Sequence, residues 1–110
     1  MGPMSLYHPA TEDLELPAIL QALSDPQRLR VVRELAHDPA PRPCGSFELP
    51  VSKSTCTHHF RVLREAGVIA QREVGTARLT TLRRDDLDER FPGLLDAVLA
   101  AAGEPAAVPA

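Results

Sequence analysis

Apolar residues recur at helical spacing along most of the chain. The first stripe follows i, i+3, i+4, i+7 spacing, which predicts a helix over residues 13–23 with Pro17 tolerated in its first turn. Its members are Leu16, Ile19, Leu20 and Leu23. The segment SDPQRLRVVREL predicts a second helix, with Asp25 as its cap and Pro26 at its first position, that should end before Pro39.

The stretch after the second helix interrupts this pattern. Residues 37–43, HDPAPRP, predict a stiff linker that cannot be helical, and a short turn of helix is expected around CGSFEL. The most regular segment follows at residues 52–66, where Ser52 is a good N-cap and Gly67 is expected to end the helix. Its buried stripe is formed by Cys56, Phe60 and Leu63.

Beyond Gly67 the apolar period changes from helical to strand-like. VIAQREV and ARLTTL are rich in β-branched or alternating apolar residues, and the GT at 75–76 between them predicts a two-stranded hairpin. RRDDLDERF predicts a turn of helix, and PGLLDAVLAAA predicts a final amphipathic helix with Pro92 near its start. The apolar side of this last helix carries Leu94, Leu95, Val98 and Leu99. The expected fold class is mainly α with a small β-hairpin.

Length and composition indicate one small folded domain. We expect a flexible N-terminal arm over residues 1–12, a folded domain over residues 13–102 and a disordered tail over residues 103–110. A chain of 110 residues buries a single core, and association with a second copy would add useful burial, so a dimer is expected. No apolar run approaches the ~20 residues that cross a bilayer, so no membrane partner is expected.

The start of the chain and the cysteine count bear on its compartment. MGPMSLYHPATEDLEL has no basic segment followed by an apolar stretch, so it is not typical of a secretory signal and a cytoplasmic location is expected. The chain has two cysteines, Cys44 and Cys56. A single pair in a chain without a signal is typical of two reduced thiols rather than a disulfide.

The net charge of −3 hides an uneven distribution along the chain. Residues 42–84 hold eight of the twelve basic residues but three of the fifteen acidic ones. The basic residues of this segment are Arg42, Lys53, Arg61, Arg64, Arg72, Arg78, Arg83 and Arg84. A basic middle within an acidic frame can bind phosphate with one surface while the rest keeps the protein soluble. A solvated charged face is the alternative interpretation.

The stretch VSKSTCTHHF, residues 51–60, concentrates side chains that bind metals, attack electrophiles or donate hydrogen bonds. His58 and His59 are consecutive on a helix and point ~100° apart, so they cannot chelate one ion together. Cys56 lies on the buried stripe, which favours packing over metal binding or catalysis. No oxyanion site, phosphate loop or paired carboxylates accompany it, so we expect no enzymatic activity. The remaining interpretation is a helix with a polar, exposed face.

That polar face suits DNA. Its side chains all donate or accept hydrogen bonds within the first three turns, and such a helix fits the ~12 Å major groove. They are Lys53, Ser54, Thr55, Thr57, His58 and Arg61. The hairpin carries Arg72 and Arg78 around its tip, where they are placed to reach the DNA backbone or minor groove.

Three segments together resemble the ArsR family of winged helix-turn-helix repressors. They read LSDPQRLRVVREL, SKSTCTHHFRVLREAGVI and REVGTARLTTL, and the resemblance spans roughly residues 14–100. The most specific part matches the pattern S-x-S-T-x-[ST]-x-H-[FL]-x-x-L-x-x-A-G-[LV]-[IV]. It is filled by Ser52, Ser54, Thr55, Thr57, His59, Phe60, Leu63, Ala66, Gly67, Val68 and Ile69.

The resemblance implies a dimeric winged helix-turn-helix repressor of transcription. Two recognition helices, residues 52–66 of each copy, would enter successive major grooves of a partly palindromic double-stranded operator. The dimer would be built mainly from the first and last helices. Its apolar candidates are Leu16, Ile19, Leu20, Leu94, Leu95, Val98 and Leu99. By the same resemblance, His59 corresponds to the family's common histidine, which either packs or binds.

The chain departs from the family at its sensing sites. Many relatives hold metals on a CxC-like box before the recognition helix, but here that region reads PCGSFELP with Cys44 alone. Other relatives bind zinc between the last helices with His and acids, whereas residues 85–102 contain no histidine. We therefore expect no metal and no cofactor. A redox switch that joins Cys44 to Cys56 and displaces the recognition helix is a hypothesis that stays open.

Two other function classes serve as alternatives. A winged-helix module can act in protein association without binding DNA, but it should then show apolar residues on the exposed face of 52–64. An enzyme would need a catalytic constellation that the sequence does not show. The basic and hydroxyl side chains on that face favour DNA binding.

Overall fold

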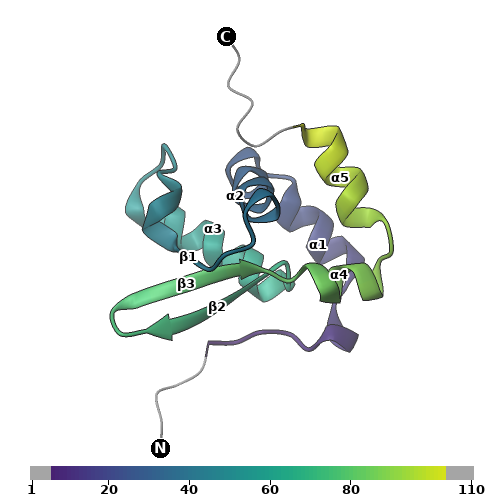
Figure 1. The fold of residues 1–110 in the computed structure, drawn as a ribbon, viewed down its shortest axis with the longest axis horizontal. Coiled ribbons are helices and arrows are strands. Elements are labelled where there is room, and N and C mark those ends of the chain that lie inside the picture. The colour runs from purple at the N-terminus through teal and green to yellow at the C-terminus, as the bar shows by residue number, and fades with distance from the viewer. Residues whose placement is uncertain (1–5, 104–110) are drawn as a thin grey trace, which may run out of the picture.

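The structure, a computed structural model, describes residues 6–103 and confirms the winged helix-turn-helix fold class (Figure 1). Helices lie over one side of a small antiparallel sheet whose hairpin projects away from the body. The structure contains two elements that the sequence did not predict, a 3-10 turn before the first helix and a two-residue strand. In chain order the elements are η1 (Thr11–Asp13), α1 (Leu16–Leu23), α2 (Pro26–His37), β1 (Arg42–Pro43), η2 (Cys44–Phe47), α3 (Lys53–Ala66), β2 (Ile69–Val74), β3 (Ala77–Leu82), α4 (Arg84–Arg90) and α5 (Leu94–Ala102).

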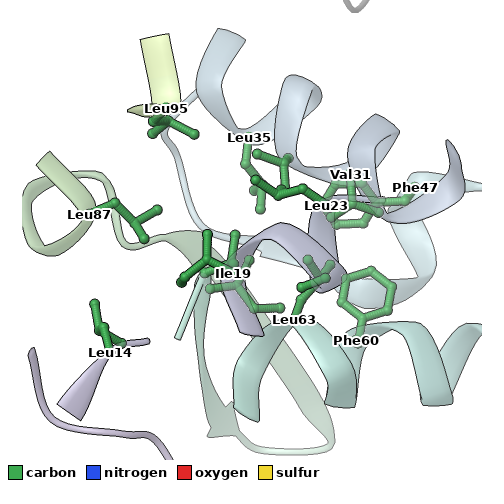
Figure 2. Packing of buried hydrophobic residues seen from close by; sticks show 14 residues of the cluster. Leu14, Ile19, Leu23, Val31, Leu35, Phe47, Phe60, Leu63, Leu87 and Leu95 are labelled. Carbon is green, nitrogen blue, oxygen red and sulfur yellow. The ribbon is translucent and has the colours of Figure 1, made fainter. Parts of the chain in front are cut away.

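The apolar stripes of α1, α2 and α3 meet in one core, which Figure 2 shows from close by. Ile19 of α1, Val31 of α2 and Leu63 of α3 are each almost fully buried. Phe47 of η2 closes one end of this core against Phe60 of α3, with ring centroids 5.4 Å apart and tilted by 56°. The three helices are therefore held in a fixed arrangement by a shared apolar interior.

The caps of α2 and α3 form as the sequence predicts. The Asp25 side chain accepts hydrogen bonds from the backbone N–H groups of Gln27 and Arg28, and Pro26 occupies the first turn. Ser52 caps α3 by accepting from the Thr55 N–H at 3.2 Å. These caps set where the two helices of the helix-turn-helix unit begin.

Gly67 ends α3 and also makes room for the segment before α1. It adopts φ +90°, which glycine tolerates, and a Cβ at this position would overlap the Leu14 side chain. Leu14 is 1% exposed and fills the core from an extended segment, so α1 begins at Leu16 rather than at residue 13. The helix expected over 13–23 is thus shorter, because residues 11–13 form the 3-10 turn.

The hairpin of β2 and β3 is confirmed, with Gly75 and Thr76 as the turn. Residues Arg42 and Pro43 of the expected linker pair with Thr80 and Leu79 and form β1, giving the strand order β1-β3-β2. A two-residue strand shows no alternation of apolar and polar residues, so no sequence pattern predicts it. The added strand gives β3 a neighbour on its second edge.

Residues 6–12, expected within a flexible arm, contact the body of the protein in the structure. His8 Nε2 accepts a hydrogen bond from the Gln71 N–H at 2.9 Å, and the Pro9 carbonyl accepts from Arg83 at 2.7 Å. Thr11 donates to Asp86 at 2.8 Å. This segment runs beside the edge strand β2 (Figure 1). Residues 1–5 and most of the expected tail, 104–110, lie outside the described residues.

Candidate nucleic-acid interface

One face of α3 presents a row of exposed polar side chains. Lys53 leads the row, the others follow at spacings that keep them on one side of the helix, and together they line a shallow hollow. The five are Lys53, Ser54, Thr57, His58 and Arg61. Arg61 donates to the Nδ1 of His58 at 3.4 Å, so these two outer side chains touch. This face offers both donors and acceptors over about two turns of helix.

Thr55, the sixth predicted contact, lies at the start of the helix but in a different setting. Its hydroxyl oxygen accepts a hydrogen bond from the Ser52 hydroxyl at 2.9 Å. The side chain is exposed and belongs to the cap network rather than to the row along the helix. Thr55 is therefore placed beside the first turn, where unpaired backbone N–H groups attract anions.

The opposite side of α3 packs into the protein. Phe60 and Leu63 are buried, and Cys56 is half-buried against the core cluster. Burial raises the pKa of the Cys56 thiol, with the nearby Cys44 adding to the shift. His58 and His59 point apart: His58 is exposed, and His59 is 7% exposed. The two faces read from the sequence are thus present in the structure.

His59 connects the recognition helix to the rest of the helix-turn-helix unit. Arg28 of α2 donates from Nη1 to His59 Nδ1 at 3.2 Å, which requires the proton of a neutral imidazole to sit on Nε2. That Nε2 lies 3.8 Å from the Asp25 carboxylate. Partial burial opposes ionisation of Asp25, but hydrogen bonds from the Arg28 and Gln27 backbone N–H groups and the positive charge of Arg28 together lower its pKa.

Arg28 was not singled out by the sequence, yet it joins three helices. Besides His59 of α3, its guanidinium donates to the carbonyls of Ala22 at 2.7 Å and Gln21 at 3.2 Å, which end α1. An arginine one turn after the Asp25 cap resembles an ordinary surface residue in sequence. Its role depends on the packing of α1, α2 and α3 and becomes visible in three dimensions.

The hairpin forms a wing beside α3. Arg72 is exposed on β2, and Arg78 lies on β3 directly opposite Glu73, 3.7 Å from its carboxylate. An open cleft of about 340 Å³ separates the wing from α3. Lys53 and Thr57 line its helix side, whereas Arg78 lies on its wing side. The two predicted DNA-binding elements thus flank a common hollow.

The basic residues of the middle segment, residues 42–84, differ in whether they form ion pairs. Arg42 lies 4.0 Å above the Phe47 ring and pairs with Glu34, whereas Arg83 and Arg84 pair with acids of α4 and α5. Within residues 6–103, no acid lies within ion-pair distance of three exposed cations. These are Lys53, Arg61 and Arg72. Among the basic residues of this segment, the exposed positive charge that has no acid partner therefore lies on α3 and the wing.

Known proteins are similar to this chain in sequence and fold. A family model described as a helix-turn-helix domain matches residues 23–72. The HTH-type transcriptional regulator YceK of Bacillus subtilis is 35% identical over 80 residues, which cover 71% of this chain and 80% of that protein. An ArsR-like transcriptional regulator from Rhodococcus sp. RHA1 superposes with a TM-score of 0.56 at 27% identity, covering 79% of this chain and 88% of that one. This chain belongs to the ArsR-type helix-turn-helix family of transcriptional regulators.

A further solved structure supports the fold of this ArsR-type regulator. The ArsR family transcriptional regulator RHA00566 superposes with a TM-score of 0.63 at 20% identity and covers 81% of this chain and 98% of that one. The family model spans the end of α1, all of α2 and α3 and β2 as far as Arg72. The matched segment therefore includes every residue of the exposed row on α3.

The predicted dimer residues divide into three groups by exposure. Ile19 and Leu95 are 1% and 2% exposed and pack in the core of their own chain, so they have almost no surface to offer a partner. Leu16 and Leu20 of α1 are 41% and 46% exposed. The other three are half-buried on α5: Leu94, Val98 and Leu99. Available apolar surface therefore lies mainly at Leu16 and Leu20.

Both cysteines of this regulator line the cleft between α3 and the wing. Cys44 lies beside β3, with its Sγ 3.4 Å from the Thr80 hydroxyl and 3.6 Å from the Arg78 carbonyl. Both are free thiols. In the part of the chain that the structure describes, no group of three or more His, Cys, Asp or Glu residues is arranged to hold a metal ion. The same part has no helix long and apolar enough to cross a membrane.

Proposed function

We propose that this regulator is a sequence-specific repressor that binds operator DNA as a homodimer. The observation that carries the proposal is the exposed face of α3, where Lys53, Thr57 and Arg61 stand among other polar side chains with no apolar residue in the row. Lysine and arginine read guanine edges or contact phosphates, and hydroxyls contact either. The α3 helix would occupy the major groove.

The wing would contact the DNA backbone beside that groove. Arg72 and Arg78 both lie on the hairpin that flanks α3. Lys53 and Arg78 form a cationic border around the cleft between the helix and the wing, whereas Arg72 lines a separate hollow with Pro41 and Leu79. Phosphate contacts of this kind fix the orientation of a protein on DNA, whereas base contacts from the recognition helix give specificity. In this proposal the wing contacts phosphates, and Ser54, Thr57 and His58 contact the bases.

Two copies would read the two halves of a partly palindromic operator. Half-sites bound by such dimers lie about 34–36 Å apart, one turn of the double helix. Leu16 and Leu20, four residues apart on α1, supply exposed apolar surface for the contact between copies. Repression of transcription follows from occupancy of a promoter by this dimer, and the cytoplasmic location belongs to the same proposal.

The polar character of α3 also weighs against the competing function. A winged-helix module that binds only proteins would bury apolar side chains on this face, yet its exposed row consists of hydroxyl, imidazole and cationic groups. The family comprises regulators of transcription, and we propose no enzymatic activity for this member.

The test is a gel-shift assay on the DNA upstream of the protein's own gene, with a second duplex selected by the protein from a random-sequence pool. We expect a shifted band that specific duplex displaces and unrelated duplex does not. Lys53→Ala combined with Arg61→Ala should abolish the shift, whereas Arg84→Ala, a cation paired with Asp88 and Asp96 on the far helices, should preserve it. Equal binding to all duplexes would refute sequence-specific recognition.

A further inference from the structure

Gln71 occupies a junction between four parts of the fold. Its side chain accepts a hydrogen bond from Arg64 Nη1 at 2.7 Å through Oε1 and donates from Nε2 to Cys44 Sγ at 3.0 Å and Thr80 Oγ1 at 3.1 Å. Its backbone N–H donates to His8 Nε2 at 2.9 Å. One residue thereby contacts α3, η2, β3 and the segment before η1. Its side chain is 4% exposed, so these bonds form away from solvent.

The Arg64 contact links this junction to the recognition helix. Arg64 lies in the last turn of α3 and is 8% exposed. Burial lowers the pKa of its guanidinium, and the charge of Arg78 adds to this shift. The guanidinium stays positively charged at any physiological pH, so its buried N–H groups need acceptors inside the protein. These acceptors are Gln71 Oε1 and the Tyr7 carbonyl. Hydrogen bonds to charged groups are shorter and stronger than neutral ones.

The position of Gln71 in the hairpin allows the junction to set the direction of the wing. Gln71 pairs with Thr80 at the level where the two strands leave the body, and Arg72 and Arg78 lie just beyond it. Outward from there the cleft separates the wing from α3, so the outer wing is not packed against the recognition helix. The direction of the wing relative to α3 is therefore set at its base, where Gln71 meets Arg64.

We propose that Gln71 is a positioning residue for DNA binding, which fixes the wing relative to α3 so that Arg72 and Arg78 reach the backbone while α3 occupies the groove. This inference rests on the proposed DNA-binding function. The side-chain oxygen of Gln71 is what matters for this role, because it is the acceptor for the buried Arg64 guanidinium, whereas the nitrogen additionally donates to Cys44 and Thr80. An apolar side chain of the same length fills the space but leaves the buried guanidinium without this acceptor.

The experiment compares Gln71→Met, Gln71→Glu and the wing variant Arg72→Ala/Arg78→Ala in the full chain. Each is titrated into a duplex selected by the wild-type protein from a random pool, with anisotropy followed across a salt series. Gln71→Met should reproduce the loss of salt slope seen in the wing variant, about 2 if each arginine meets one phosphate. Gln71→Glu keeps an acceptor for Arg64 and should retain the wild-type slope.

A second readout separates positioning from folding. Hydroxyl-radical footprints of Gln71→Met should lose protection at the flanking backbone and keep the central protection given by α3. Adding Gln71→Met to the wing variant should then cause little further loss of affinity, because both remove the same contacts. The active fraction of each variant is measured by stoichiometric titration, so partial unfolding does not enter the slope.

The contrary results are distinct. If Gln71→Met lowers the melting temperature but keeps the wild-type salt slope and the full footprint, Gln71 acts on stability alone and the proposal is overturned. Full additivity with the wing variant would also overturn it, since independent sites add. If the wild-type protein binds no duplex at all, the failure lies with the proposed function and not with Gln71.

Discussion

Arg28 Nη1 donates to His59 Nδ1 at 3.2 Å, which ties the second helix of the fold to the recognition helix. The same guanidinium caps the end of α1 through the Ala22 carbonyl. This hydrogen bond is directional, so it acts together with the apolar packing to fix the angle at which α3 is presented. The face of α3 that we assign to DNA is thus held by residues behind it.

Replacing Arg28 with methionine should therefore weaken both folding and DNA binding. The methionine keeps the aliphatic bulk but removes the donors to His59, Ala22 and Gln21, and we expect a loss of about 1–3 kcal/mol in the free energy of unfolding. Urea unfolding followed by circular dichroism measures this loss. Arg30→Met is the matched control, because Arg30 lies on the same helix, its side chain is 41% exposed and it pairs with Glu34 of that helix. Equal stability of the two variants would contradict the linking role of Arg28.

The bond between His8 and the Gln71 backbone predicts a pH dependence. Burial lowers the pKa of His8, a hydrogen bond to the Leu6 carbonyl opposes this shift, and the Arg64 and Arg83 charges add to it. The folded protein therefore binds fewer protons than the unfolded chain, so stability from His8 is complete above the ordinary histidine pKa. It is lost as the pH falls through the lowered value.

His8→Gln tests this dependence. Wild-type stability should fall more steeply than that of the variant as the pH drops from neutrality through the range where histidine titrates. Thermal melts at a series of pH values give the comparison, and an NMR titration of the His8 ring gives its pKa directly. Parallel pH profiles for the two proteins would contradict a lowered His8 pKa in the folded protein.

The dimer proposal is tested at α1. Leu16→Glu combined with Leu20→Glu places two charges on the exposed apolar pair and should yield a folded monomer with much weaker operator binding. Light scattering reports the mass and circular dichroism the fold. Leu95→Glu is not a suitable probe, because Leu95 is 2% exposed and its replacement would disrupt the core. A dimer that survives the double substitution would place the interface elsewhere.

The thiol hypothesis concerns Cys44 and Cys56, which line one cleft. With a hydroperoxide as oxidant, two thiols would give one disulfide, the peroxide oxygen leaving as water and alcohol. The bridge would pull α3 toward η2 and take Cys44 from Gln71, so DNA affinity should fall and recover on reduction. Cys44→Ser should abolish the response. Free-thiol titration and mass spectrometry verify that the disulfide has formed. Unchanged DNA binding after its formation would contradict the hypothesis.

Local patterns predicted the recognition helix well. Ser52 and Gly67 mark its ends through backbone rules that act within one turn, and the spacing of Phe60 and Leu63 identifies its buried side. From these, the exposed row on the other side follows by geometry alone. The hairpin was predicted for the same reason, since Gly75 and the alternation of residues on either side are local signals.

Contacts between residues far apart in the sequence were not predicted. His8 and Gln71 are 63 positions apart, and nothing in either neighbourhood indicates that an imidazole will cover the edge of β2. Likewise, the stripe on α1 does not reveal that Ile19 faces its own core while Leu16 faces outward. One helix can bury part of a broad apolar stripe and expose the rest, and the division depends on what packs against it.

The central claim is that α3 and the wing bind DNA through their unpaired cations, and salt dependence of operator affinity tests it most directly. Anisotropy titrations of the selected duplex at a series of salt concentrations give the slope of log K against log salt, which should be about −0.9 for each phosphate contacted. Arg61→Ala should reduce its magnitude by about 1 if Arg61 meets a phosphate, with base preference unchanged. An affinity that stays constant from low to physiological salt would contradict the assigned interface.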